Sequence, residues 1–186
     1  MQKRICGPAY VVGDDIDTDQ MIPAQYLTYN PADASERKYF GKYAMSGLPT
    51  AAQGLPQGGI PFVKEGLFKS DYRVVIAGRN FGCGSSREHA SVCLQEAGIE
   101  AVCAEFYSRI FFRNSVNGGY LIPFESQERL ADKIRTGDVV EIDVEKNTIV
   151  DKTQGRTFML KPLGDVLPIL EAGNVFEYAR RAGFIK

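Results

Sequence analysis

Asn80-Phe-Gly-Cys-Gly-Ser-Ser-Arg-Glu-His89 is a glycine-rich stretch that carries two serine hydroxyls, a guanidinium and the chain's only histidine. An apolar run over 73–78 precedes it and predicts a short buried strand, and apolar residues at helical spacing follow it. The stretch is therefore expected to be a strand-to-helix turn, with a helix that begins at Ser85 or Ser86. Glycines at 78, 82 and 84 permit backbone conformations that a side chain would forbid.

The residue types in this turn indicate an anion site. Arg87 would stand in the first turn of the helix, where the helix dipole favours acids. A residue placed against local preference often serves a ligand, and a planar guanidinium beside helix amides matches a carboxylate or a phosphate. Two other interpretations stay open. Ser85 and Glu88 fit a capping box, and His89 fits a hydrogen-bonded structural histidine.

The order of elements after the turn predicts an α/β fold. Strands are expected over 99–104 and 120–124. The helix between them, over 106–116, would carry Phe106, Ile110 and Phe111 on one apolar stripe. Alternation of this kind gives parallel strands with helices packed on the sheet.

The remaining segments extend this fold. A short helix is expected over 126–137, an antiparallel meander over 139–160, and one or two helices broken at Gly173 over 166–183. Residues 30–69 are rich in Pro, Gly and Ala and are expected to form a long irregular excursion. The length of 186 residues suits a single domain over 1–186.

Composition excludes several classes of function. The formal net charge of −1 gives no broad basic surface, so no nucleic-acid partner is expected. No apolar run approaches the roughly 20 residues that span a bilayer, and no signal peptide is recognisable, so we expect no membrane and a cytoplasmic location. The cysteines are expected to be reduced, with Cys93 and Cys103 in the core and no metal site on this chain.

A second constellation is acidic. Asp14, Asp15, Asp17 and Asp19 place four carboxylates within six residues. Like charges this close repel one another unless a cation pairs with them or water solvates them. The simplest interpretation is a solvated acidic loop, because the spacing lacks the glycine and the terminal glutamate of a calcium-binding EF-hand.

Three motifs taken together resemble one family. Gly13-Asp-Asp-Ile-Asp-Thr-Asp-Gln-Met-Ile-Pro23, the turn from Asn80 to Ala90, and Arg109-Ile-Phe-Phe-Arg-Asn114 resemble the small subunit of 3-isopropylmalate dehydratase, which corresponds to the swivelling domain of aconitase. The resemblance extends over essentially the whole chain. It implies an α/β fold of the aconitase swivelling β/β/α type, with a mixed sheet, flanking helices and a short antiparallel meander.

The resemblance also implies an activity that this chain does not perform alone. Members of the family act in leucine biosynthesis as hydro-lyases of two chains, isomerising 2-isopropylmalate and 3-isopropylmalate by dehydration and rehydration. The implied partner is a large subunit, in a heterodimer or heterotetramer, that carries a [4Fe-4S] cluster as Lewis acid. The implied substrate is a small dicarboxylate, and no cofactor is expected on this chain.

Motif positions give each candidate residue its implied role. Ser85 matches the serine whose alkoxide removes a proton beside a carboxylate, and Arg87 matches the carboxylate-binding arginine. Asp19 and Thr18 match the family's Thr-Asp motif, while Leu27 and Thr28 lie on the loop that distinguishes the substrate's variable group. The residues that the resemblance places at the substrate are Ser86, Arg87, Asp19, Thr18, Leu27 and Thr28.

Two alternatives remain at this point. The same scaffold serves related hydro-lyases of the homoaconitase, citraconate/methylmalate and methylthioalkylmalate types, and one loop does not separate them. A stand-alone anion-binding module that borrows the fold is the alternative from a different class.

Overall fold

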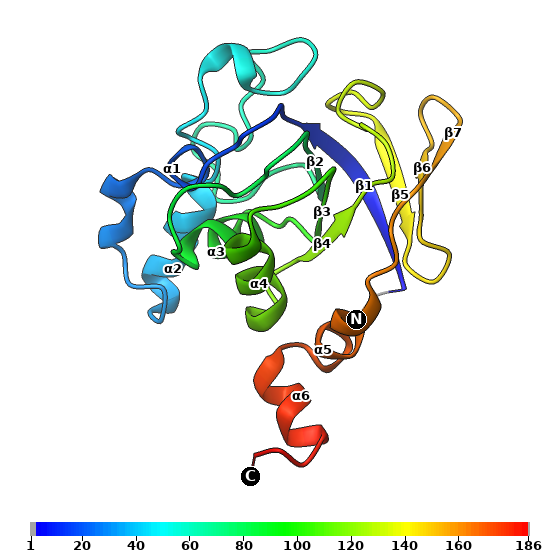
Figure 1. Ribbon diagram of the computed structural model, residues 1–186. Coiled ribbons are helices and arrows are strands. Elements are labelled where there is room, and N and C mark those ends of the chain that lie inside the picture. Colours follow the sequence, from blue (N-terminus) through cyan, green and yellow to red (C-terminus); the bar gives the residue numbers. More distant parts are fainter. Residues whose placement is uncertain (1–2, 186) are drawn as a thin grey trace.

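The computed structural model describes residues 3–185, which form a seven-stranded mixed sheet in the order β4-β3-β2-β1-β5-β6-β7. Figure 1 shows helices gathered around the half of the sheet that contains β2, β3 and β4, with the meander at the other edge. The predicted mixed α/β architecture is confirmed.

The parallel half follows the predicted alternation of strands and helices. It contains β2 (Val74–Ile76), α3 (His89–Glu96), β3 (Ala101–Ala104), α4 (Arg109–Gly118) and β4 (Ile122–Glu125). These strands are apolar and almost entirely buried, as is typical of a parallel sheet covered on both faces. Their carboxyl ends meet at one edge of the sheet, and the turn over 80–88 follows β2 at that edge.

The first strand joins the two halves of the sheet. β1 (Arg4–Val11) pairs in parallel with β2 and antiparallel with β5 (Val139–Asp143). β6 (Thr148–Asp151) and β7 (Arg156–Met159) complete the antiparallel meander. The predicted meander is therefore confirmed, and β5 and β6 alternate buried with partly exposed residues as one-sided strands do.

Two apolar cores lie on the two faces of the sheet. In β2, Val75 belongs to one core, and Val74 and Ile76 belong to the other, because successive strand side chains point to opposite faces. Helices cover both cores: Phe40 of α2 joins the first and Leu170 of α5 joins the second.

The excursion over 30–69 is not irregular throughout, contrary to expectation. It contains α2 (Ala34–Lys42) and the 3₁₀ turn η2 (Thr50–Ala52). Asp33 caps α2 by accepting the Ser35 N–H (2.8 Å), and Phe40 is fully buried. α2 packs against α3, so the excursion covers one face of the parallel half.

The prediction of a helix over 126–137 is wrong, and the segment forms turns. Leu130 and Ile134 are buried, as the apolar spacing requires. However, the backbone here bonds to distant strands: the Gly137 N–H donates to Ala9 O (2.9 Å) and the Thr136 hydroxyl oxygen accepts the Val11 N–H (2.9 Å). One local turn remains, in which the Ile134 N–H donates to Leu130 O (2.9 Å), and these bonds to β1 prevent its continuation as a helix.

The apolar stripe expected over 106–116 is also wrong in part. α4 begins at Arg109, so Phe106 lies outside it, and the side chains of Phe106 and Ile110 are 45% and 41% exposed. Phe106 is outside the helix because its carbonyl accepts the Phe81 N–H (3.2 Å), which keeps this segment extended beside the turn. Phe111 is buried as expected.

The chain ends in a 3₁₀ turn and two short helices, η3 (Gly164–Val166), α5 (Leu167–Ala172) and α6 (Val175–Arg181). The predicted break at Gly173 is confirmed, and its φ of +106° is one that other residues rarely adopt. α5 and α6 both contact α4, and α6 extends away from the sheet (Figure 1).

The four cysteines are all free thiols, and Cys93 and Cys103 are buried as expected. Within residues 3–185, no helix combines the length and the apolar character needed to cross a bilayer.

Candidate active site

The turn over 80–88 is joined to the acidic loop by hydrogen bonds. The Gly82 N–H donates to Ile16 O (2.8 Å), and the Thr18 N–H donates to Cys83 O (2.9 Å). The Ser85 N–H then donates to Oγ1 of Thr18 (3.0 Å), a buried side chain 67 residues earlier in the chain. Two distant segments therefore form one unit at the carboxyl ends of the parallel strands.

Two glycines allow the turn to lie this close to its neighbours. Gly82 has φ of +79°, and a Cβ added there would lie 2.2 Å from Cγ of Phe111. At Gly78, an added Cβ would lie 1.9 Å from Oδ1 of Asp14. Gly82 is thus required both by its backbone conformation and by space, whereas Gly78 is required by the approach of the acidic loop.

α3 begins at His89, and the predicted start at Ser85 or Ser86 is wrong. The Ser85 N–H is taken by Thr18, and Glu88 precedes the helix without a side-chain cap. The Glu88 carboxylate instead accepts the Tyr120 hydroxyl (3.3 Å). The capping box between Ser85 and Glu88 therefore does not form.

The extended start of this segment leaves donors next to Ser85. In the part of the chain that the structure describes, the backbone N–H groups of Ser86, Arg87 and Glu88 donate to no protein acceptor. Successive free N–H groups beside a guanidinium suit an anionic ligand. The sequence predicted that amides at the start of a helix would bind the anion. In the structure, the N–H groups of residues 86–88 are available for this instead.

The carboxylates of the acidic loop have partners, so the predicted solvated loop is wrong for most of them. Asp15 accepts the side-chain amide of Asn80 (2.9 Å). Asp17 caps α1 (Thr18–Met21) in a capping box with Gln20. These contacts hold the loop in one conformation beside the turn.

Asp14 belongs to a charge network that the sequence did not reveal. Nη1 of Arg129 lies 2.6 Å from Asp14 and 2.8 Å from Glu105, and its Nε lies 2.9 Å from Asp132. Arg79 pairs with the other oxygen of Asp14 (3.2 Å). Partial burial alone would raise the pKa of the Asp14 carboxyl, but the hydrogen bonds from Arg129 and Arg79 outweigh it, so the pKa is lowered.

The only signal for this network was the need for a cation near four carboxylates. Nothing local pointed to Arg129, which lies 115 residues from Asp14 in the chain. The network ties the loop before α1 to the segments that follow β2, β3 and β4.

The structure brings together five of the predicted site residues: Ser85, Ser86, Arg87, Thr18 and Asp19. Ser85 is half-buried, and Ser86 is exposed. Nη1 of Arg87 lies 3.9 Å from Oδ1 of Asp19, with side chains 48% and 71% exposed. A pair this open contributes little to stability and leaves both groups accessible. Thr18 lies behind Ser85 and contacts its amide.

Asn114, on α4, is a further residue at the turn. Its side-chain amide donates to Ser86 O (3.1 Å) and so fixes the backbone between the two motifs. The sequence placed Asn114 in a family motif but gave it no role.

Leu27 and Thr28 lie on η1 (Ala24–Thr28), the 3₁₀ turn that follows α1. Leu27 packs partly against the first core, and Thr28 is exposed and donates to Gln25 O (3.4 Å). Tyr26 of the same turn stacks on Tyr43 with ring centroids 3.7 Å apart. Among residues 3–185, no hydrogen bond joins Leu27 or Thr28 to the turn over 80–88.

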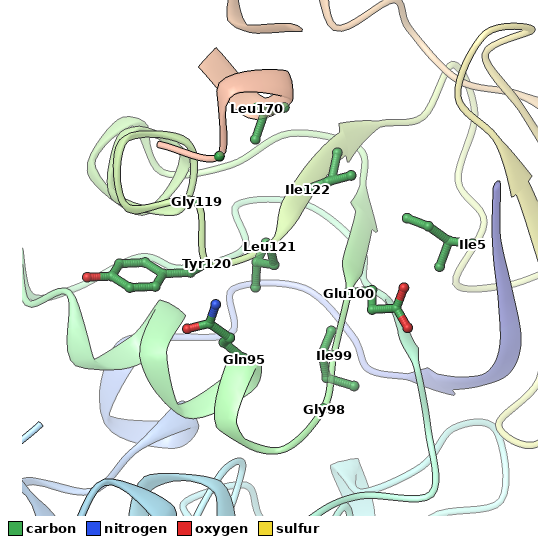
Figure 2. Close-up of a pocket in the computed structure, with 11 residues that line it drawn as sticks. Ile5, Gln95, Gly98, Ile99, Glu100, Gly119, Tyr120, Leu121, Ile122 and Leu170 are labelled. Carbon is green, nitrogen blue, oxygen red and sulfur yellow. The ribbon is translucent and has the colours of Figure 1, made fainter. Parts of the chain in front are cut away.

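Two cavities of similar volume lie away from these residues. One, of about 400 Å³, opens at the amino ends of β3 and β4, where Figure 2 shows Glu100, Ile122 and Leu170 around it. The other, of about 410 Å³, lies between α4 and α5. Neither cavity is lined by Ser85 or Arg87, so the candidate site is an open surface at the carboxyl ends of the parallel strands, outside both cavities.

Metal ligands do not cluster in residues 3–185, where no group of three or more His, Cys, Asp or Glu side chains could hold an ion. Cys83 lies in the turn, but burial, with Asp17 and Asp15 nearby, raises the pKa of its thiol. The thiol is therefore held neutral, which opposes a role as a thiolate ligand.

His89 does not make the hydrogen bonds expected of a structural histidine. Its Nδ1 is buried and, among the described residues, has no partner, and its ring lies 5.4 Å from that of Phe40. Burial, and then the charge of Arg87, lowers the pKa of the imidazole below 6.5. The neutral ring is therefore the form that suits the folded chain.

We expect His89 to make folding sensitive to mild acid. The unfolded chain, with a histidine pKa of about 6.5, binds a proton that the folded chain resists, so the free energy of unfolding falls as pH drops through 6.5. Urea unfolding at pH 7.5 and 5.5 measures this loss, and His89→Gln is the control in which it shrinks. Because the chain has one histidine, an NMR titration reads its pKa directly, and a value above 6.5 would contradict the expectation.

Comparison with known proteins shows the family to which the chain belongs. The Aconitase C-terminal domain family matches residues 62–129. The protein named 3-isopropylmalate dehydratase small subunit 1 from Arabidopsis thaliana is 46% identical over 186 residues, covering 99% of this chain and 72% of the relative. The protein of the same name from Archaeoglobus fulgidus is 44% identical over 175 residues, covering 94% and 96%.

A solved structure gives the same result. The crystal structure of 3-isopropylmalate dehydratase from Methanocaldococcus jannaschii matches with a TM-score of 0.77 and 37% identity, covering 97% of this chain and 96% of that one. Sequence and fold agree over nearly the whole length, so the chain belongs to the family of 3-isopropylmalate dehydratase small subunits.

Proposed function

We propose that this chain is the small subunit of a two-chain hydro-lyase of leucine biosynthesis, which isomerises 2-isopropylmalate and 3-isopropylmalate by dehydration and rehydration. The observation that carries the proposal is the unit of Thr18, Ser85 and Arg87 at the carboxyl ends of the parallel strands, in a chain with these relatives. In open α/β sheets, ligands bind at that edge.

Ser85 is the proposed base. As an alkoxide, its Oγ takes a proton from the carbon next to a carboxylate, while the hydroxyl on the neighbouring carbon leaves. Return of the proton and of water to the resulting alkene in the opposite sense moves the hydroxyl between the two carbons. A serine hydroxyl is a very weak acid, so its anion needs stabilisation by nearby positive charge.

Arg87 and the free N–H groups of residues 86–88 are the proposed source of that charge. Thr18 acts one step behind, because its Oγ1 accepts the Ser85 N–H and so holds the backbone that carries the Ser85 side chain. This is a positioning role and refines the direct substrate contact that the family motif implied.

Residues on both sides of Ser85 are proposed to bind the substrate. Arg87, with Ser86, binds one carboxylate of the dicarboxylate, and Asp19, 3.9 Å from the guanidinium, is proposed to lie at the substrate as well. Leu27 and Thr28 are proposed to contact the variable group, which is an isopropyl group in this substrate.

The open surface around Ser85 supports a two-chain enzyme. The [4Fe-4S] cluster is proposed on the large subunit, where it would supply a Lewis acid for the substrate hydroxyl. The four free thiols suit a reducing compartment, and we place the pair in the cytoplasm.

Steady-state rates of the reconstituted pair test this function. Across a panel of 2-isopropylmalate, homoaconitate, citraconate and a methylthioalkylmalate, the highest kcat/KM is expected for 2-isopropylmalate. An equal or higher value for homoaconitate would contradict the substrate assignment. Purification of the chain from its native cells without a larger iron–sulfur protein would favour the stand-alone anion-binding module instead.

A further inference from the structure

Two exposed apolar side chains border the proposed active site. Phe106 and Ile110 are 45% and 41% exposed, and they lie just before α4 and in its first turn. Their segment is bonded to the turn on both sides: Phe81 exchanges backbone bonds with Phe106 O (3.2 Å) and the Ser108 N–H (3.0 Å). The apolar pair is therefore continuous with the surface that carries Ser85.

Single exposed apolar side chains are common, so their position matters more than their exposure. Other large apolar residues are exposed elsewhere on the described chain, but none of them belongs to a segment bonded to the turn. These are Leu67, Val139, Met159, Phe176, Phe184 and Ile185.

The same helix carries two arginines that this chain does not neutralise. Arg109 and Arg113 are exposed, and within residues 3–185 neither forms an ion pair. They stand four residues apart, where like charges repel, and Arg109 opposes the dipole at the start of α4, which has no acid in its first turn. This unfavourable arrangement indicates acidic groups supplied from outside the chain.

A cavity lies beside these two arginines. The cavity of about 410 Å³ between α4 and α5 is lined by Arg109 and Arg113, by apolar residues that include Phe112, Val116 and Ile169, and by Glu125, whose carboxylate pairs with Lys161 (2.8 Å). A partner side chain can bury apolar atoms there while an adjacent carboxylate meets a guanidinium.

We propose that Phe106, Ile110, Arg109 and Arg113 form an α4 docking surface for the cluster-bearing large subunit. This inference rests on the proposed function, in which a second chain must cover Ser85. A partner seated on α4 necessarily reaches the turn, because Asn114 of the same helix bonds to Ser86.

The charges favour the large subunit over a second copy of this chain. A symmetric contact between two copies at α4 would place each pair of arginines near its own equivalent. Repulsion between four positive charges would oppose that contact, whereas an acidic face on a different protein would not.

The test is the affinity of this chain for its large subunit, measured by titration calorimetry with the purified proteins. Combined Phe106→Glu and Ile110→Glu substitutions are expected to weaken binding by roughly 100-fold or more. Arg109→Glu with Arg113→Glu is expected to weaken binding and to reduce its dependence on salt. Met159→Glu, which alters a side chain of similar exposure on β7, is the matched control and is expected to bind normally.

The binding measurements distinguish an error in the docking surface from an error in the proposed function. If the wild-type chain binds the large subunit and the Phe106→Glu, Ile110→Glu variant binds equally well, the docking surface is overturned and the function stands. Self-association of the wild-type chain that this variant abolishes would assign the surface to a second copy and overturn the proposal. If the wild-type chain binds no large subunit, both proposals fail.

Discussion

Ser85→Ala in the two-chain enzyme is expected to lower kcat by roughly 10²–10⁴-fold, the range that a positioned general base contributes. The Ser85 side chain is half-buried beside Arg87, and its backbone N–H is bonded to Thr18, so the turn that carries the proposed base is held in place. The loss should fall mainly on kcat, because Arg87 and Ser86 continue to bind the carboxylate. Steady-state kinetics with 2-isopropylmalate measure both constants.

The matched control removes a hydroxyl that has no place in the site. Thr157→Val alters an exposed residue of β7, on the meander side of the sheet, and is expected to leave kcat unchanged. The Ser85→Ala chain should also bind the large subunit normally, which separates lost chemistry from lost assembly. Turnover within a few-fold of wild type would exclude Ser85 as the base.

Gly82→Ala is expected to destabilise the chain by about 3 kcal/mol. Part of this cost is the backbone, since a φ of +79° costs an alanine about 1–2 kcal/mol. The rest is overlap, because the new Cβ would lie 2.2 Å from Cγ and 2.4 Å from Cβ of Phe111, and overpacking costs about 1–3 kcal/mol. Urea unfolding measures the loss as a lower midpoint.

Gly98→Ala separates the two contributions. Gly98 has φ of +96°, but an added Cβ meets nothing within 4 Å, so only the backbone cost of about 1–2 kcal/mol applies. The difference between the two variants therefore measures the overlap at the turn. Equal losses would mean that Phe111 moves aside freely and that the close packing of the turn on α4 is not required.

The sequence predicts the elements whose pattern is local. The parallel strands and the meander follow from apolar runs and from alternation, and Gly173 breaks the C-terminal helices as its residue type suggests. The family motifs imply that the turn and the acidic loop share a site, which stays a prediction; in the structure the Ser85 N–H donates to Oγ1 of Thr18 in the acidic loop.

The errors share one physical cause, which is bonding between residues far apart in the chain. α3 begins late because the Ser85 amide bonds to Thr18, and the segment around Leu130 is not a helix because the backbone after it bonds to β1. Phe106 leaves the predicted helix for the same reason. No window of local sequence contains these competing partners.

α2 and the network of Arg129 were missed for different reasons. The helix signals at Asp33 and Phe40 lie in a segment whose glycines and prolines favour an irregular interpretation. Arg129 was missed because a charge partner carries no spacing that identifies it. A requirement for positive charge near Asp14 could be stated from the sequence, but not its source.

The attachment of η1 has a consequence for how the substrate range of such an enzyme can change. The turn with Ser85 is fixed by Thr18, Asn114 and the backbone of the acidic loop, whereas η1 is held by the stacking of Tyr26 on Tyr43 of the excursion. The parts proposed for proton transfer and for substrate choice are thus held by different side-chain contacts. Mutation can therefore retune the selectivity of residues 24–28 while the proton-transfer machinery stays in place, so one reaction can spread across a series of related substrates.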